Sequence, residues 1–420
     1  MTLPGRSALQ NDPAARPVAV APRTVWIMLG ALTTAFALSQ AWRTVAAILA
    51  APLQADFQLS PSELGLFAAA FHFAFGAMQW LMGLGIDLHG VRRTVLTAFP
   101  VAIAGSVISA LASSYGVLVA GQVLIGIGCA PAFLVCTVFI ARYFPAGRFA
   151  AVSGLTLGLG GIGMLMTGTP LAWLVEATSW RMGFWVLGGC AALAWLLIFS
   201  LVHEPVQAAD PAPKESLRQA LRSFGALFKL PHTLGIVLLA GVGYASFISL
   251  RGLWLGPLLM QRHAFSLVQS GNVALLMSLA SMLGPPLFGR LDPGPAKRRR
   301  WIVGFTMLLA GLFAVLALTH SRYIDVAVPI LIGALSGGLV LQYADVRAAY
   351  PAAMTGRAMA VFTMAMFLGV AAMQWFTGKV ASWALAHGAD PFTAVLAAIA
   401  ALLVSGALAF VLLPKPARRH

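Results

Sequence analysis

The sequence predicts an all-α membrane protein with twelve transmembrane helices, arranged as two pseudo-symmetric six-helix bundles. Of its 420 residues, 60% are hydrophobic and only 9% are charged, a composition that excludes an ordinary soluble domain. Twelve apolar runs follow one another between residues 24 and 413. Each is long enough for the roughly 20 residues with which a helix crosses a bilayer. Charged and turn-forming residues also recur at matching positions in the two halves of the chain.

Polar segments divide the chain into five parts. Residues 1–23 form a polar, proline-rich tail, and residues 414–420 form a second tail. The two bundles occupy residues 24–202 and 232–413. Between them, residues 203–231 form the longest polar connection, in which we expect a linker with one amphipathic surface helix. A simple spacer and a regulatory or lipid-binding segment both remain open for this linker.

The positions of the cations predict the orientation in the membrane. The net charge is +15, and 21 of the 27 lysines and arginines fall on the side that carries both termini. Because cytoplasmic loops are enriched in lysine and arginine, we expect both termini in the cytoplasm. The cations occupy short loops and not one continuous face, which argues against nucleic-acid binding. High usage of alanine, glycine and arginine favours a bacterial inner membrane as the location.

The two halves repeat each other at an offset of 205 to 209 residues. Three pairs of ionic residues share this offset: Asp87 with Asp292, Arg142 with Arg347, and Arg148 with Arg357. The repeat predicts a six-plus-six duplication, with parallel halves related by an axis along the membrane normal. In this arrangement the substrate site lies near the bilayer midplane, between the halves.

One short loop between apolar runs carries the clearest motif of the chain. It reads Gly-Leu-Gly-Ile-Asp-Leu-His-Gly-Val-Arg-Arg from Gly83 to Arg93. Asp87 ends one helix, Gly90 can adopt the positive φ of a tight turn, and Arg92 with Arg93 marks the cytoplasmic side. This spacing resembles the loop between helices 2 and 3 of the major facilitator superfamily.

The resemblance covers about residues 24–413 and implies a secondary transporter that works by alternating access. Asp87 would act as a latch, pairing with arginines of its hairpin and with a helix N-terminus of the facing half. A carboxylate that only caps the turn and sets topology is the alternative. In the second half the motif survives in a weaker form around Asp292.

Four other charged residues are predicted on the cytoplasmic side, and we assign them to a gating group together with Asp87 and its hairpin. Arg148 and Arg357 open helices, where a cation opposes the helix dipole, so we expect a carboxylate near each. Asp87 and Asp345 are the candidates. Arg142 lies just beyond the fourth helix and belongs to the same cytoplasmic cluster.

Charge inside the apolar runs is the strongest clue to function. Arg43 and Arg251 lie within the first and seventh runs, whereas all twelve acidic residues lie in tails, loops or span ends. A charged side chain inside a bilayer is costly unless it faces a wet cavity or a partner. The two arginines are 208 residues apart, so the pseudo-twofold axis would place them across one cavity. Such a cavity favours an anion, most simply a carboxylate held by guanidinium groups.

Five further residues complete the predicted site. His72 lies near the middle of the second helix, where its imidazole can titrate near neutral pH, and Lys379 lies in the outer third of the eleventh. Gln40, Tyr244 and Gln374 would finish a polar, aromatic pocket. Structural alternatives stay open: an arginine bonded to carbonyls at a helix break, a neutral packed histidine, and a snorkelling lysine.

An arginine in helix 1, a histidine in helix 2 and an arginine in helix 7 resemble the substrate-binding pattern of the anion:cation symporter branch of the superfamily. That resemblance implies transport of organic anions, with Arg43 and Arg251 on the substrate carboxylate and His72 as a coupling or binding residue. Helix 4 departs from the family pattern, because Gln122 stands where arginine is usual and no carboxylate follows.

The sequence therefore predicts a secondary transporter of a small mono- or dicarboxylate, working by proton symport or by anion exchange. No phosphate-binding loop, catalytic carboxylate pair or zinc-spaced cluster is present, so we expect no enzyme activity, cofactor or metal. The expected partners are an anionic substrate, a proton or counter-anion, and membrane lipid, for a monomeric protein. An exporter of amphipathic drugs or siderophores, which tolerates loss of the arginines, and a receptor without transport activity remain alternatives.

Overall fold

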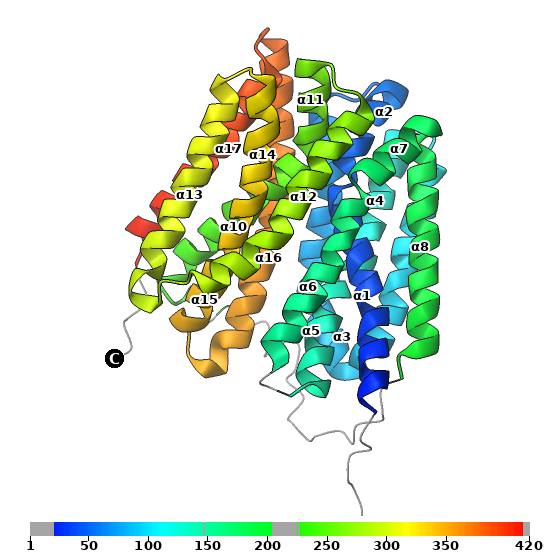
Figure 1. Cartoon of the computed structure of the whole chain (residues 1–420), viewed down its shortest axis with the longest axis vertical. Helices are drawn as coiled ribbons and strands as arrows, with labels where there is room; N and C mark the ends of the chain where they lie inside the picture. Colours follow the sequence, from blue (N-terminus) through cyan, green and yellow to red (C-terminus); the bar gives the residue numbers. More distant parts are fainter. Residues whose placement is uncertain (1–20, 146–147, 204–224, 226, 415–420) are drawn as a thin grey trace, which may run out of the picture.

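The computed structural model describes residues 21–145, 148–203, 225 and 227–414, and this part of the chain is almost entirely helical (Figure 1). Eleven of its helical segments are long and apolar enough to cross a membrane. One of them, α3 (Pro61–Ala110), has 50 residues and would extend about 75 Å if it were straight. It turns back at Gly90, where φ is 81°. This helix therefore crosses twice, and the fold has the twelve crossings that the sequence predicts.

The first half contributes six crossings, several of them built from two consecutive helices. Its helices besides α3 are α1 (Pro22–Thr44), α2 (Ala46–Phe57), α4 (Tyr115–Cys129), α5 (Ala132–Tyr143), α6 (Phe149–Met166), α7 (Thr169–Ala177) and α8 (Trp180–Leu201). The expected amphipathic helix in the linker lies outside the described residues, as do most of both tails.

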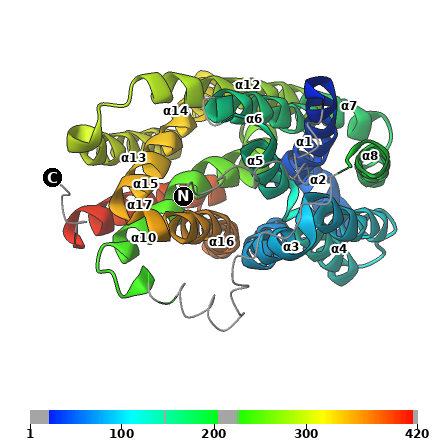
Figure 2. The ribbon, with the colours of Figure 1, turned by 90° about the horizontal axis from the view of Figure 1, so that it is seen from below.

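The second half contributes the other six crossings. Its elements are α10 (Thr233–Ser249), the π-helix η2 (Leu250–Trp254), α11 (Leu255–His263), α12 (Leu267–Arg290), α13 (Pro295–Leu318), α14 (Arg322–Leu335), the 3₁₀ turn η3 (Ser336–Gly338), α15 (Leu339–Ala349), α16 (Ala352–Ala386) and α17 (Pro391–Leu412). The helices α1 and α8 and those between them pack on one side, and α10 to α17 pack on the other (Figure 2).

The predicted repeat extends to the backbone. Gly90 has φ 81° and ψ 173°, and Gly294, 204 residues later, has φ 79° and ψ 169°. A left-handed residue ends the preceding crossing in each half, at Gln58 and at Ala264, both with φ 52°. Capping boxes then open α3 and α12, at Ser60 with Glu63 and at Ser266 with Gln269. Turns and helix starts thus repeat at an offset of 204 to 206 residues.

The two halves meet most closely at one end of the molecule. We call the end where α1 begins and α17 finishes the terminal end, and the opposite end the distal end. Toward the terminal end the halves diverge (Figure 1). Near the distal end, the main-chain nitrogen of Ser62 donates to Ser382 Oγ at 2.9 Å, and Thr169 Oγ1 donates to Asn272 Oδ1 at 2.6 Å. These bonds join α3 to α16 and α7 to α12.

Glycines allow this close approach. A Cβ atom added to Gly65 of α3 would lie 2.6 Å from the main-chain oxygen of Gln374 and 2.9 Å from Cα of Gly378. On the other side of the molecule, a Cβ added to Gly271 of α12 would lie 3.2 Å from the main-chain oxygen of Gly168. Both interfaces between the halves therefore use paired glycines, at positions related by the internal repeat.

Candidate functional site

Arg43 lies in the last turn of α1, where both halves of the molecule contact its side chain. Its Cζ is 4.6 Å from the ring centre of Phe75 on α3 and 4.7 Å from that of Phe367 on α16. Nη1 donates to Gln40 Oε1 at 2.5 Å, and Nη2 donates to Ser39 Oγ at 3.4 Å. The guanidinium group is thus held between two aromatic rings, one from each half. Its Nε is buried without a hydrogen-bond partner.

Buried polar groups that lack partners surround this arginine. His72 of α3 bonds the carbonyl oxygen of Ala68 through Nδ1 at 3.1 Å, while its buried Nε2 has no partner. Arg43 is a charged neighbour of the ring, and the amide of Gln374 of α16 lies next to it, close to hydrogen-bonding distance. Gln374 is fully buried, and neither its amide oxygen nor its amide nitrogen is hydrogen-bonded. Leaving such groups unpaired costs about 1–3 kcal/mol each, so they favour a bound polar ligand or water.

Tyr244 of α10 belongs to the same surroundings. Its ring centre lies 5.7 Å from that of Phe367, at an interplanar angle of 80°. Of the predicted binding residues, the structure therefore gathers Arg43, His72, Gln374 and Tyr244 around one place, with Gln40 as the direct partner of Arg43.

Arg251 occupies a break between helices. It lies in η2, the π-helical turn that joins α10 to α11, and it is completely buried. Nε donates to Ser278 Oγ of α12 at 2.8 Å, and Nη2 donates to the carbonyl oxygen of Met164 at 2.9 Å. Met164 lies in the last turn of α6, and its carbonyl oxygen also accepts from Thr167 Oγ1 at 3.1 Å. Nη1 remains buried without a partner.

The two arginines occupy equivalent positions but contact different helices. Arg43 reaches toward α3 and α16, and Arg251 reaches toward α12 and α6. Gln40 connects their surroundings, since it accepts from Arg43 while its Nε2 lies 4.0 Å from Met164 Sδ. Among the described residues, neither guanidinium group has an ion pair with a carboxylate. Two buried positive charges therefore lie close to the boundary between the halves without an acidic partner.

Lys379 lies apart from this group. It is exposed on α16, on the side of the helix that carries the exposed rings of Trp375 and Trp383 at positions i−4 and i+4. That face of a transmembrane helix is the one expected to contact lipid. The structure therefore does not bring Lys379 to Arg43, and we leave it out of the candidate site.

The predicted hairpin forms as expected at Gly90, and its charged residues take separate partners. Asp87 is exposed and has Arg142 of α5 as a charged neighbour. Arg92 donates to the carbonyl oxygen of Phe199 of α8 at 2.9 Å and lies 5.4 Å from that ring centre. Gly83 packs near α5, and Arg93 and Arg148 are exposed.

The equivalent loop of the second half carries an ionic network of its own. Arg298 binds Asp292 with Nη2 at 2.6 Å from Oδ2 and Nε at 3.0 Å from Oδ1. Hydrogen bonds from Arg298 hold the pKa of Asp292 below its usual value. Arg299 lies 3.9 Å from Oδ2 of Asp345 and stacks on the ring of Phe410. Asp87 and Asp345 are the carboxylates predicted near Arg148 and Arg357; the ion-pair partner of Asp345 among the described residues is Arg299.

A second network, which the sequence analysis missed, lies at the distal end. Asp325 is completely buried in the first turns of α14, with Arg262 at 3.5 Å and His263 Nε2 at 2.8 Å. Arg262 also pairs with Asp390, which caps α17, at 2.5 Å. Each of these residues lies near a helix end, where the sequence alone does not indicate whether a charged side chain is buried. The network joins α11, α14 and α17 inside the second half.

Curated relatives with similar sequences include transporters of several kinds. A probable sulfoacetate transporter of Cupriavidus necator is 24% identical over 287 residues, 66% of this chain and 66% of the relative. A probable sugar efflux transporter of Helicobacter pylori is 27% identical over 60% of this chain and 62% of the relative. A hexuronate transporter of Bacillus subtilis is 27% identical over 42% of this chain and 40% of the relative. The chain thus spans about two thirds or less of these relatives.

Solved structures share the fold over nearly the whole chain. A D-xylose-proton symporter matches with a TM-score of 0.75 at 15% identity, covering 93% of this chain and 98% of that one. A bacterial homologue of the human lysosomal transporter Spinster matches with a TM-score of 0.72 at 18% identity, covering 94% and 97%. At these identities the likeness concerns the fold alone.

The family follows from the sequence as well as from the fold. A model of the Major Facilitator Superfamily matches residues 31–374, which is most of the chain. The twelve crossings in two halves and the hairpin turn at Gly90 agree with that match. The chain is a multi-pass membrane protein that belongs to the Major Facilitator Superfamily.

Proposed function

We propose that this protein is a secondary transporter of a small organic anion, a mono- or dicarboxylate, coupled to protons or to a counter-anion. One observation carries the proposal: Arg43 and Arg251 are buried near the boundary between the halves, and no described carboxylate pairs with either. Burying an unpaired charge costs several kcal/mol, and a bound anion removes that cost. Sulfoacetate and hexuronates, which name two of the relatives, are organic anions.

The contacts of the two arginines suggest how an anion promotes exchange between states. Arg43 is held by one ring from each half, and Arg251 of the second half bonds a carbonyl of the first. An anion that binds both guanidinium groups competes with Gln40 and with the carbonyl of Met164 for their donors. Substrate binding therefore weakens some cross-boundary contacts and forms others, which is what alternating access between two rocking halves requires.

The remaining features of the proposal follow from the charge distribution and the shape. We place the terminal end in the cytoplasm of a bacterial cell, because the cation-rich loops lie there. In the present arrangement the bonds between the halves at Ser62 and Thr169 then lie on the side away from the cytoplasm. The predicted division into bundles at 24–202 and 232–413, with a linker at 203–231, and a monomeric state belong to the same proposal.

The test is thermal unfolding of the purified protein with a panel of ligands. The panel contains sulfoacetate, glucuronate, lactate, succinate, neutral xylose and a hydrophobic cation. A ligand that binds only the folded state raises the unfolding temperature by mass action. We expect at least one carboxylate to stabilise the wild type and to lose that effect in Arg43→Gln and Arg251→Gln. Arg181→Gln, which removes a half-buried arginine paired with Asp56 at the distal end, should respond as the wild type does.

Two other outcomes overturn the proposal. Stabilisation by xylose alone, unchanged in both arginine variants, indicates a sugar carrier, as the name of the Helicobacter relative suggests. Stabilisation by the hydrophobic cation alone indicates an exporter of amphipathic compounds. Counterflow of the stabilising anion in proteoliposomes then distinguishes a transporter from a receptor that only binds it.

A further inference from the structure

We propose that Asp345 is a proton-binding site, at which one proton enters and leaves during the transport cycle. The inference rests on the proposed function, because it names the coupling ion of that transporter. Asp345 lies in the second turn of α15 and is buried, with 8% of its surface exposed. It belongs to the second half and is not one of the residues that contact Arg43.

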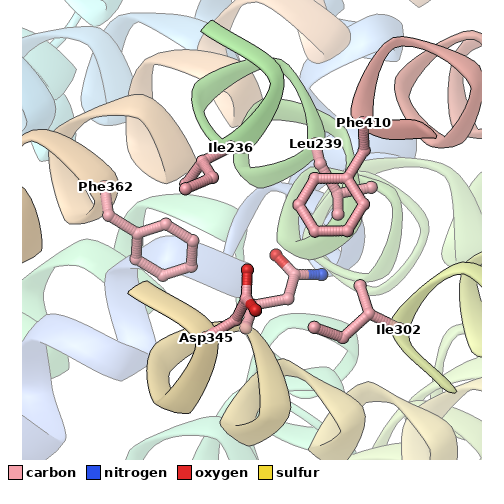
Figure 3. A pocket seen from close by; sticks show the side chains of 7 residues that line it. Ile236, Leu239, Ile302, Asp345, Phe362 and Phe410 are labelled. Carbon is pink, nitrogen blue, oxygen red and sulfur yellow. The ribbon is translucent and has the colours of Figure 1, made fainter. Parts of the chain in front are cut away.

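The carboxylate faces a small cavity. Five apolar side chains from α10, α13, α16 and α17 line it, together with Gln342 and Asp345 of α15 (Figure 3). The cavity has room for about one water molecule, and part of it is open to solvent. In Figure 3 the carboxyl group of Asp345 points into the space between Ile236 and Phe410. Protons and water can therefore reach the carboxylate, whereas a substrate-sized anion cannot fit.

The hydrogen-bonding atoms in this cavity are one donor short. Oδ2 of Asp345 and Oε1 of Gln342 are both buried, and neither has a hydrogen-bond partner. When Asp345 is ionised, its Oδ2 can only accept a hydrogen bond, and the same is true of the amide oxygen Oε1 of Gln342. Against these two acceptors stands one buried donor that also lacks a partner, Nη1 of Arg299, which lies 3.9 Å from Oδ2 and so beyond hydrogen-bond distance. A proton on Asp345 supplies the missing donor, because a carboxylic acid can donate to an amide oxygen.

The charged groups around the cavity leave Asp345 loosely held. From α13 come Arg299 and Arg298, and Arg298 is already engaged by Asp292. Tyr350, just after α15, donates to Thr233 and not to Asp345. His232, at the start of α10, stacks near Tyr350 and has Arg299 as a charged neighbour. On the side of α16 and α17 the cavity is lined by the rings of Phe362 and Phe410.

Proton binding changes the link between two helices. With Asp345 ionised, its attraction to Arg299 holds α15 against α13, while Arg299 itself is fixed on the ring and the carbonyl oxygen of Phe410. With Asp345 neutral, that attraction disappears. The turn η3, Ser336–Gly338, separates α15 from α14, and short 3₁₀ stretches inside helices often serve as hinges. Protonation thus frees α15, the part of this crossing nearer the terminal end, to move relative to α13.

The first test reads protonation directly and needs no substrate. Infrared difference spectra of the full-length protein in lipid are recorded across a pH titration. We expect a C=O stretching band of a protonated carboxylic acid that titrates with pH and is missing from Asp345→Asn. Asp56→Asn, which removes an exposed carboxylate at the distal end, should keep the band. An unchanged band in Asp345→Asn overturns the proposal, as does a wild type in which no carboxylic acid titrates.

The second test separates coupling from transport. Proteoliposomes are assayed for glucuronate or sulfoacetate counterflow at equal pH and for uptake driven by a pH gradient. We expect Asp345→Asn to keep at least half of the counterflow and to lose pH-driven accumulation at least tenfold. Full pH-driven accumulation in Asp345→Asn contradicts the proton site. Absence of counterflow in the wild type with every anion contradicts the proposed function, while the infrared titration still decides the proton site.

Discussion

Arg251 of the second half donates a hydrogen bond from Nη2 to the carbonyl oxygen of Met164 in the first half, at 2.9 Å. Each residue lies where a crossing changes its helical form, η2 for Arg251 and the end of α6 for Met164. The carbonyl oxygen of Met164 thus accepts two hydrogen bonds, one from Arg251 and one from Thr167 Oγ1 at 3.1 Å. The bond from Arg251 also gives the buried cation only neutral partners, and this property leads to the first prediction.

Replacing Arg251 by methionine should separate stability from binding. Methionine fills much of the same volume, and removing a buried charge without an ionic partner is often neutral or stabilising. We therefore expect the unfolding temperature of the ligand-free variant to equal or exceed that of the wild type, with the shift caused by the anion abolished. Differential scanning fluorimetry measures both. A strongly lowered unfolding temperature would show that the bonds to Ser278 and Met164 dominate.

Gly65 should be required for the close contact between α3 and α16 at the distal end. In Gly65→Val the added side chain meets the main-chain oxygen of Gln374, which lies 2.6 Å from the position of Cβ. Since backbone cannot yield as a side chain does, α3 and α16 must separate. We expect a longer distance between spin labels at Ala177 and Gln261 in a cysteine-free background, measured by double electron–electron resonance. Gly30→Val, where no atom lies within 4 Å of the added Cβ, is the control.

The distal network of Arg262 should be a major contributor to stability. Arg262→Ala leaves the buried carboxylate of Asp325 without its cation, and removal of one partner of a buried pair costs about 3–5 kcal/mol. Urea or thermal unfolding of the full-length protein should detect this loss of stability. Arg322→Ala, an arginine on α14 that stacks on the ring of Phe265 without an ion pair among the described residues, should change stability much less. Equal effects of the two substitutions would contradict the assignment.

The same network predicts a loss of stability in acid. Burial acts to raise the pKa of Asp390, but hydrogen bonds from Thr393 and Arg262 outweigh it and lower that pKa to about 2. A carboxylate with a lowered folded pKa stabilises the protein above its unfolded pKa, near 4, and loses that contribution as the pH falls toward 2. Asp390→Asn should therefore be less stable than the wild type at pH 6, and the difference should shrink below pH 4.

Much of this architecture could be predicted from sequence because it depends on local signals. Apolar runs, the cation-rich loops and the need for a positive φ at Gly90 are each visible in one short segment. The pairing of Arg43 with rings of two different helices is a tertiary property, as is the burial of Asp325 and Asp345 near helix ends. Spacing could place those carboxylates at a membrane boundary, but only packing of neighbouring helices determines that they are buried.

The aromatic sandwich around Arg43 gives the last prediction. The rings of Phe75 and Phe367 lie 4.6 and 4.7 Å from its Cζ, and a desolvated cation–π contact contributes on the order of 1–2 kcal/mol. Phe367→Leu keeps an apolar side chain but removes the ring contributed by the second half. We expect the dissociation constant of the stabilising anion to rise roughly tenfold, since 1.4 kcal/mol corresponds to one factor of ten. Isothermal titration calorimetry measures it, with Phe376→Leu as the control because Phe376 is exposed on the same helix. If Phe367→Leu binds the anion as tightly as the wild type, the ring only fills space, and the orientation of Arg43 depends on Gln40 and Ser39 alone.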